Sequence, residues 1–396
     1  MFRVLNSSQL ARLTTCLTGT AVISQYQLLS SEQPCSQSLR RISTNSSEKV
    51  AHPCSKANKF VAGCPELKIF TGNANPVLAG MVADELHTSV GLAKVHSFAD
   101  GEISVKVLES CRGKDVYIIQ PTAPPVNENL MELLLLISAL RRSSAKKVSV
   151  VLPYFGYMRS AVTDIKRKYE DEDAGDAISF RSNLAASDVA RMIEVAGAQR
   201  VVALDLSAYG QGMPEGFFQN IPIESIHSSN FVADNLIEEL DLKELKDDGL
   251  VVVSSHAACI SNAKLIREEL KSKLNVSIGL ATIIRDPATG GADLVGDCGN
   301  KKVLIIEDIV DSGKTTLNAV RSCKAHGATT VYCFGSHPIM GSKCADRLQE
   351  AGIEKMIVLN TVNIPQSTID ACPNLVVVSV APVIAELIAK MHYEPK

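Results

Sequence analysis

The sequence lacks several features that would assign it to a specialised class. Its 11 cysteines include no Cys-x-x-Cys pair and no cysteine–histidine spacing of the zinc type, which argues against a disulfide framework and a structural metal site. No apolar run approaches the roughly 20 residues needed to cross a bilayer, and the nearest, residues 133–140, predicts a buried helix. No basic stripe with interleaved aromatic residues occurs, and the formal net charge is −3. Neither nucleic acid nor a membrane is therefore an expected partner.

The first 62 residues differ from the rest of the chain in charge. They contain seven basic and only two acidic residues, a net charge of +5, and they are rich in serine and threonine. A basic, serine-rich and acid-poor segment is typical of an organelle transit peptide, so we expect a mitochondrial or other organelle address. The alternative is a disordered extension without an address, in a cytoplasmic protein.

From about Leu67 onward, short apolar runs alternate with stretches of helical periodicity. The apolar runs indicate parallel strands covered on both faces. The alternation of strands and helices predicts an α/β fold of two doubly wound, mainly parallel sheets, in which ligands bind at the carboxyl ends of the strands. The strands are expected in LKIFTG, VYIIQP, KVSVVLPYF, RVVALDL, LVVVSS, VSIGLATI, KVLIIED, TVYCFGS, KMIVLN and LVVVSV. Only the charged run between 158 and 183 breaks the pattern, and it predicts a solvated loop.

Residues 303–316, VLIIEDIVDSGKTT, carry the clearest chemical signal. The strand VLII is expected to deliver Glu307 and Asp308 to its carboxyl end, where carboxylates suit a divalent cation. The next residues, Asp311, Ser312, Gly313, Lys314 and Thr315, supply hydroxyls and backbone N–H groups just before a predicted helix. Glycine allows close approach of an anion, and a helix N-terminus favours negative charge, so the segment predicts a phosphate site.

The segment has two other interpretations. Gly313-Lys314-Thr315 matches the end of a nucleotide P-loop, but that motif needs glycine at the position of Asp308, and a carboxylate there would repel phosphates. We reject that interpretation. The other is an acidic turn followed by a helix capped by Ser312.

The segment resembles the phosphoribosyl-binding motif of type I phosphoribosyltransferases. The N-terminal half, with KIFTGNANPVLAGMVADEL, the long stretch from HSFADGE to VVLPYFGY, and IVLNTVNIP near the end, resembles the ribose-phosphate diphosphokinase family over residues 67–392. This resemblance implies diphosphoryl transfer from Mg²⁺-ATP to C1 of ribose 5-phosphate. It also implies dimers within hexamers, with the ATP pocket completed by a neighbouring subunit.

The resemblance also assigns roles to individual residues. Phe98, Asp100 and Glu102 match the adenine-binding segment, and Arg159 matches an arginine that contacts ATP. Arg285 falls where a catalytic loop carries an arginine that neutralises phosphate charge. The ribose 5-phosphate site is implied at Glu307, Asp308, Asp311, Ser312, Gly313, Lys314 and Thr315, with Asp308 a candidate Mg²⁺ ligand.

Several positions depart from the family pattern. Ser207 stands in place of a metal-associated histidine, and Ser160-Ala161 in place of Gln-Asp. His256 stands in place of an aspartate, in a segment without the family's glycine pair, and Ile283 in place of the catalytic lysine. His256 is a candidate metal ligand, although a single histidine after a strand is more often structural. Loss of cationic and metal contacts raises the barrier to phosphoryl transfer, because this reaction depends on positioning and charge neutralisation.

Three functions follow. The first is a diphosphokinase homologue with a transit segment at 1–62, an ATP-side domain at 66–222 and a ribose 5-phosphate-side domain at 223–396. The second is a regulatory subunit, weak or inactive in catalysis, that assembles with an active synthetase paralogue. The third, a phosphoribosyltransferase, leaves the N-terminal half unexplained.

Overall fold

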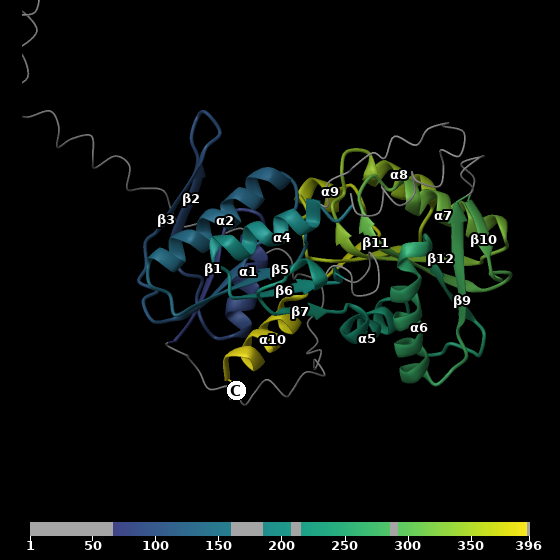
Figure 1. Ribbon diagram of the computed structural model, residues 1–396. Coiled ribbons are helices and arrows are strands. Elements are labelled where there is room, and N and C mark those ends of the chain that lie inside the picture. Colours follow the sequence, from purple (N-terminus) through teal and green to yellow (C-terminus); the bar gives the residue numbers. More distant parts are fainter. Residues whose placement is uncertain (1–65, 160–184, 207–214, 286–291, 394–396) are drawn as a thin grey trace, which may run out of the picture. The chain divides into compact units, whose positions relative to one another are not determined.

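The computed structural model describes residues 66–159, 185–206, 215–285 and 292–393 (Figure 1). The predicted segment 1–62 and the charged run from 160 to 182 therefore lie outside the described residues. All described elements belong to one unit, Ala57–Lys396. Among the described helices, none combines the length and the apolar composition that a membrane span requires.

The first sheet has five parallel strands in the order β1-β4-β5-β6-β7. They are β1 Leu67–Thr71, β4 Asp115–Ile119, β5 Lys147–Leu152, β6 Arg200–Leu204 and β7 Ile223–Ile226. The helices of this half are α1 Pro76–Glu85, α2 Val126–Arg142 and α4 Ala185–Ala196, with a short turn of 3-10 helix at Glu215–Phe217. The predicted domain boundary at 222 falls just before β7, which nevertheless pairs with β6 in this sheet.

A separate antiparallel hairpin joins β2, Ala93–Ser97, to β3, Ile103–Val107. In Figure 1 it projects beyond α2, and helix α2 packs against β3. The hairpin separates β1 from β4 in sequence, although these two strands are neighbours in the sheet.

The second sheet has seven strands in the order β10-β9-β8-β11-β12-β13-β14. They are β8 Leu250–Ser254, β9 Gly279–Arg285, β10 Ala292–Val295, β11 Lys302–Val310, β12 Thr330–Pro338, β13 Lys355–Leu359 and β14 Leu375–Val378. The helices are α5 Ser229–Glu239, α6 Ile260–Leu274, α7 Lys314–Ala325, α8 Cys344–Ala351, α9 Gln366–Asp370 and α10 Ala381–Tyr393, with a 3-10 turn at Ala257–Cys259. Only β10 runs antiparallel to its neighbour.

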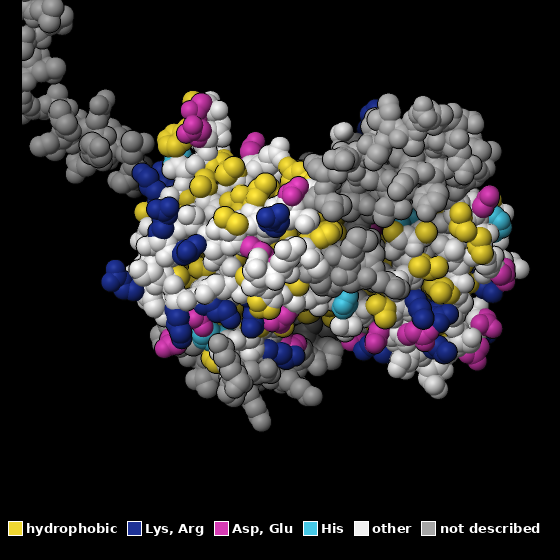
Figure 2. Space-filling view, in the orientation of Figure 1, with side chains coloured by type: hydrophobic (Ala, Val, Ile, Leu, Met, Phe, Trp, Pro, Cys, Tyr) yellow, Lys and Arg dark blue, Asp and Glu magenta, His cyan; other side chains and the backbone are white. Residues whose placement is uncertain are grey.

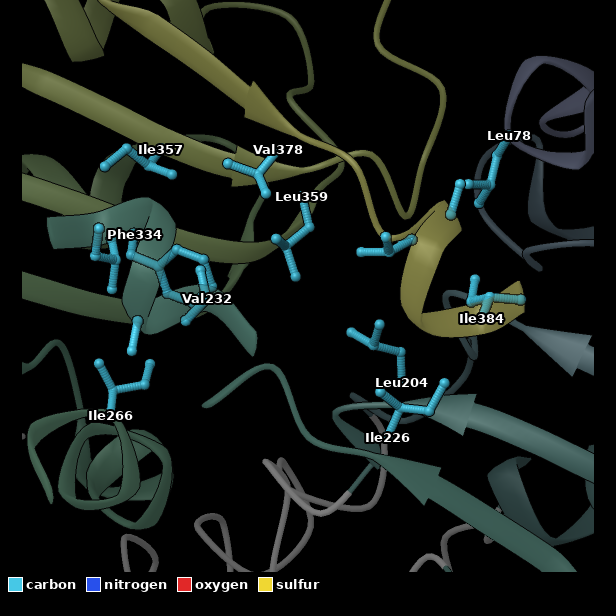
Figure 3. Packing of buried hydrophobic residues seen from close by; sticks show 14 of the residues in the cluster. Leu78, Leu204, Ile226, Val232, Ile266, Phe334, Ile357, Leu359, Val378 and Ile384 are labelled. Atoms are coloured by element: carbon cyan, nitrogen blue, oxygen red, sulfur yellow. The ribbon is translucent and has the colours of Figure 1, made fainter. Parts of the chain in front are cut away.

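The core is shared between the two sheets. One cluster of buried side chains includes Leu204 and Ile226 from the first sheet, Phe334 from the second, and Val232 and Ile384 from helices α5 and α10. Figure 3 shows Leu204 and Ile226 facing Ile384, and Phe334 lying beside Val232. Helix α10, at the end of the described chain, also packs on α1. The two sheets are thus joined by apolar packing as well as by the chain.

Candidate functional site

The strand order of the second sheet reverses between β8 and β11. From β8 the chain builds outward through β9 and β10, and then returns to place β11 on the other side of β8. In open α/β sheets a crevice for ligands lies at the carboxyl ends of the strands where the order reverses. The first sheet has no such reversal between adjacent parallel strands. A ligand site is therefore expected at the carboxyl ends of β8 and β11.

Strand β11 starts where the sequence predicts and continues two residues further, to Val310, and Glu307 and Asp308 lie within it. Successive side chains of a strand point to opposite faces, and the two buried acids accordingly meet different partners. Thr316, in the first turn of α7, donates its hydroxyl hydrogen to Glu307. Asp308 Oδ1 lies 3.2 Å from His256 Nε2 and accepts from the Ile309 amide at 2.7 Å.

The loop between β11 and α7 has the form expected of an anion-binding turn. Gly313 has φ of +72° and forms the N-cap of α7, which starts at Lys314. An added Cβ at Gly313 would lie 3.3 Å from Cys344 Sγ, a tight contact, and the positive φ itself favours glycine. Ser312 and Lys314 are exposed and Thr315 is partly exposed. The N-cap is Gly313, while the Ser312 hydroxyl accepts from the Lys314 amide at 3.4 Å, so Ser312 still contacts the first turn of α7.

Arg159 reaches this loop from the other half of the chain. Its Nη1 lies 2.7 Å from Asp311 Oδ2, in a pair whose side chains are 51% and 39% exposed. Solvent screening leaves little stabilisation in a pair of this exposure. Tyr154, which follows β5, lies close to Arg159, and burial raises its pKa while the arginine opposes that shift. The structure thus brings the predicted ATP-side arginine and the predicted ribose-side loop together.

The turn after β8 brings a histidine and a cysteine to the same point. His256 precedes the 3-10 turn Ala257–Cys259, and its Nε2 lies 3.2 Å from Cys259 Sγ as well as 3.2 Å from Asp308 Oδ1. The ligand atoms of these three residues all lie within 4.8 Å of one another. The sequence spacing did not reveal this group, because pairing of β8 with β11 supplies the third residue.

The electrostatics of this group follow from its burial. Burial alone would raise the pKa of Asp308, but the hydrogen bond and charge of His256 and the Ile309 amide outweigh it, so this carboxyl has a pKa below its ordinary value. Burial, together with the charges of Asp308 and Glu307, raises the pKa of the Cys259 thiol well above its ordinary value. Without a bound cation the thiol is thus protonated at neutral pH.

Polar residues at the ends of β6 and β12 form a second group that the sequence analysis missed. Buried Asp205 accepts from the Ser228 amide at 2.7 Å and from the Ser336 hydroxyl. His337 Nδ1 lies 3.1 Å from Thr361 Oγ1, and the ring meets Tyr154 edge to face. The available signal was the polar Gly-Ser-His at the end of an apolar run. This group connects the carboxyl ends of the two sheets.

The predicted adenine-binding residues Phe98, Asp100 and Glu102 lie at the tip of the β2–β3 hairpin. The turn is closed by Phe98 N donating to Glu102 O at 2.8 Å, and Asp100 Oδ1 accepts from the Glu102 amide at 3.1 Å. All three residues are exposed, and the Phe98 residue is 53% exposed. Among the described contacts, none joins this tip to residues 307–315. The structure therefore does not bring the hairpin tip and the β11 loop together within one chain.

The remaining predicted positions lie on β9. Arg285 ends this strand and is paired with Ala292, and its side chain lies outside the described residues. Ile283, aligned with the family's catalytic lysine, is only 2% exposed and packs in the core of the second sheet. That position therefore faces the interior. Residues 207, 160 and 161, which carry other departures, lie outside the described residues.

Comparison with known proteins identifies the family. Residues 67–197 match the N-terminal domain of ribose phosphate pyrophosphokinase, and residues 263–395 match a phosphoribosyl synthetase-associated domain. Among curated relatives, ribose-phosphate pyrophosphokinases of Caldanaerobacter subterraneus and Clostridium perfringens are 36% and 35% identical. Both alignments cover 82% of this chain, and they cover 95% and 94% of the relatives.

A solved structure agrees with this result. The phosphoribosylpyrophosphate synthetase of Mycobacterium smegmatis is 31% identical and aligns with a TM-score of 0.71, over 83% of this chain and 99% of that one. The predicted α/β fold with two mainly parallel sheets is confirmed, as is the resemblance drawn from the sequence. From these matches and the fold, the chain belongs to the ribose-phosphate pyrophosphokinase family.

Proposed function

We propose that this chain binds ribose 5-phosphate at the β11 loop and transfers the diphosphoryl group of ATP to the C1 hydroxyl of the sugar. The products are AMP and 5-phosphoribosyl 1-diphosphate, which serves nucleotide biosynthesis. The observation that carries the proposal is the convergence at the carboxyl end of β11. There an acid pair, a glycine turn and a helix N-terminus adjoin an arginine from the first half. Family membership supports the reaction class.

The chain's own residues divide this work. The 5-phosphate is proposed to lie at residues 311–315, where the N-terminus of α7 and the hydroxyls of Ser312 and Thr315 offer donors to an anion. The acids of β11 are proposed to accept from the ribose hydroxyls. Arg159, already held beside Asp311, is proposed to turn toward the phosphates of ATP and neutralise their charge.

Magnesium fits only part of this site. The carboxylates of Asp308 and Asp311 are the ligand type that Mg²⁺ takes, whereas the imidazole and thiol at the end of β8 are not. Mg²⁺ is therefore proposed to arrive with the phosphates of ATP and to offset the charge of the transferring group. No magnesium ligand is proposed at the end of β8.

A second candidate function is that of a regulatory subunit. Two observations favour it: Ile283 is buried where the resemblance has a catalytic lysine, and His256 replaces an acid. Such a subunit keeps a site for the sugar phosphate and contributes to an assembly whose catalysis depends on a paralogue.

The assay that separates these functions supplies the purified chain with Mg²⁺-ATP and ribose 5-phosphate. Formation of AMP together with phosphoribosyl diphosphate, at the rate of ordinary synthetases, would remove the regulatory interpretation. If neither product forms, the assay is repeated with an active paralogue that is co-expressed with this chain. A change in the paralogue's rate of phosphoribosyl diphosphate synthesis would support the regulatory function. Absence of both effects would contradict both functions.

We further propose that the chain works as an oligomer. The hairpin tip is exposed and separate from the β11 loop, as expected if it completes the ATP pocket of a neighbouring subunit. Apolar side chains are exposed on the same half, and Figure 2 shows several of them over α2 and α4. The exposed apolar residues of this half include Leu92, Leu108, Met131, Met192 and Val195. Analytical ultracentrifugation of the purified chain tests this, and a sedimenting monomer would contradict it.

The organelle address of residues 1–62 is also a proposal, supported by their basic and acid-poor composition. Fusion of these residues to a fluorescent reporter tests it. A diffuse cytosolic signal would contradict the address.

A further inference from the structure

The group at the ends of β8 and β11 consists of His256, Cys259 and Asp308. It joins residues 52 apart in sequence through the parallel pairing of the two strands. Cys259 is fully buried, the side chain of Asp308 is 6% exposed, and that of His256 is 29% exposed. The imidazole therefore lies at the edge of the group, while the thiol and carboxylate lie beneath it.

Two of the distances in this group are close to those between neighbouring ligands of one small cation, and the third is within 4.8 Å. Tetrahedral zinc holds nitrogen, oxygen and sulfur at roughly 2.0 to 2.3 Å, which separates neighbouring ligand atoms by roughly 3.3 to 3.6 Å. The histidine nitrogen lies 3.2 Å from both the sulfur and the carboxylate oxygen. Small adjustments of the side chains would admit a cation between them.

A hydrolytic triad does not explain this arrangement. In a cysteine–histidine–acid triad, one ring nitrogen faces the thiol and the other faces the carboxylate. Here both neighbours face the same nitrogen, Nε2. That nitrogen carries at most one hydrogen, so it is unable to relay a proton from sulfur to the acid. A nitrogen, a sulfur and a carboxylate oxygen within 4.8 Å of one another are instead a set of donors that could hold a metal ion.

The chemistry of the three donors selects the class of cation. Thiolate and imidazole suit Zn²⁺ and related transition cations, whereas Mg²⁺ takes oxygen ligands. The resemblance has an aspartate at the position of His256 and a glycine pair in the same segment, so the turn after β8 has a nitrogen donor in place of an oxygen donor and also carries a thiol. The change at this turn therefore favours a different class of cation and does not merely remove one metal contact.

We propose that His256, Cys259 and Asp308 form a binding site for a divalent transition cation of the zinc class. Three protein ligands leave the fourth position of a tetrahedral site to water or to an oxygen of another ligand. Binding releases the thiol proton and places a double positive charge beside β11. Because Asp308 is shared with the proposed ribose site, the cation and ribose 5-phosphate should affect each other's affinity, a coupling that rests on the proposed function.

The test uses the full chain after chelation and dialysis, titrated with Co²⁺, Zn²⁺ and Mg²⁺. Co²⁺ at one equivalent should give the visible absorption of a tetrahedral site and a near-ultraviolet sulfur-to-cobalt band, and Zn²⁺ should bleach both. Mg²⁺ in large excess should not. Absence of stoichiometric Co²⁺ or Zn²⁺ binding would overturn the proposal, as would Co²⁺ binding without the sulfur band.

Variants locate the site within the chain. Cys259→Ser should abolish the sulfur-to-cobalt band. His256→Asn should weaken Zn²⁺ binding by at least roughly 10- to 100-fold, because that is the loss measured when a residue that only supports a metal ligand is replaced. The matched control is Cys111→Ser, a buried thiol of the first half whose sulfur contacts only backbone oxygens among its described hydrogen-bond partners. Circular dichroism checks that each variant is folded. Unchanged Zn²⁺ binding in folded Cys259→Ser and His256→Asn would overturn the proposal.

A second measurement separates this inference from the proposed function. Calorimetric titration with ribose 5-phosphate is run on the Zn²⁺-loaded and the chelated chain, and the affinities should differ at least about fivefold, the lower range of ordinary coupling. If the sugar phosphate binds neither form while the cobalt spectrum is as expected, the ribose site fails and the metal site stands. Equal affinities would overturn only the coupling.

Discussion

The carboxyl ends of β8 and β11 lie side by side, yet they differ in what they retain of their family. The end of β11 has the acid pair, the glycine turn and the helix start that the resemblance implies for sugar-phosphate binding. The end of β8 has a histidine and a cysteine where the resemblance has an acid. One strand end has the residues that the resemblance implies, while its neighbour has different donor atoms. The proposed sugar-phosphate site and the proposed metal site therefore meet at Asp308, which belongs to both.

The largest expected effect is loss of ribose 5-phosphate binding in a variant of the β11 loop. Replacement of Asp311 and Thr315 by alanine should abolish ribose 5-phosphate binding, because it removes a hydroxyl donor of the proposed phosphate turn and the carboxylate that holds Arg159 beside that turn. Isothermal titration calorimetry measures the loss. Asp293→Ala, which removes an exposed acid of β10, is the control and should bind normally. Unchanged binding in the double variant would mean that the sugar phosphate lies elsewhere.

The next effect concerns the arginine that reaches the β11 loop from the first half. Arg159→Ala should weaken ATP binding roughly 10- to 100-fold, the range for lost hydrogen bonds to charged groups. Lysine should restore it only in part, since it lacks the planar fork of arginine. Equilibrium binding of a fluorescent ATP analogue provides the measurement. Arg142→Ala, an exposed arginine at the end of α2, is the matched control. Equal affinity in both variants would contradict the role of Arg159.

A smaller effect follows from the turn itself. Gly313→Ala places a side chain at φ of +72° and should lower the free energy of unfolding by about 1–2 kcal/mol. It should also weaken ribose 5-phosphate binding, because the turn moves. Gly80→Ala is the control: no atom lies within 4 Å of its added Cβ, and alanine favours the α1 helix, so stability should rise. Urea unfolding compares them, and equal stability of the two variants would argue against strain at Gly313.

The smallest expected effect is a pH dependence at the end of β12. Burial lowers the pKa of His337 below its ordinary value of 6.5, despite the opposing charges of Asp205 and Asp308. The unfolded chain therefore binds a proton more readily than the folded one, so stability should be complete above pH 6.5 and fall as the pH drops below it. His337→Asn should flatten this dependence. Thermal unfolding between about pH 7.5 and 5 tests it, and identical slopes would contradict it.

Much of the fold could be predicted from local sequence. Near-continuous apolar runs such as residues 250–254 and 302–306 are strands because both of their faces are covered. The start of α7 followed from Gly313 and the hydroxyls around it. The β2–β3 hairpin was missed because its strands are half-exposed and carry no strong alternation. The antiparallel β10 was also missed, since a four-residue run gives little signal.

The candidate site could be predicted only where its residues are neighbours in sequence. Residues 307–315 are continuous, so their chemistry was visible in the sequence. The metal-type group was not, because Asp308 meets His256 only through strand pairing across 52 residues. The pair between Arg159 and Asp311 is more distant still, and depends on how the two sheets pack. Patterns local in sequence identify strand ends, whereas the strand order decides which ends meet.

The apolar cluster that spans both sheets has a consequence for handling this protein. Because Leu204, Phe334 and Ile384 share one buried cluster, removal of either half would strip the other of its lining and leave apolar surface in water. Separate expression of the halves should therefore yield aggregation-prone fragments. Heating of the intact chain should produce a single calorimetric transition.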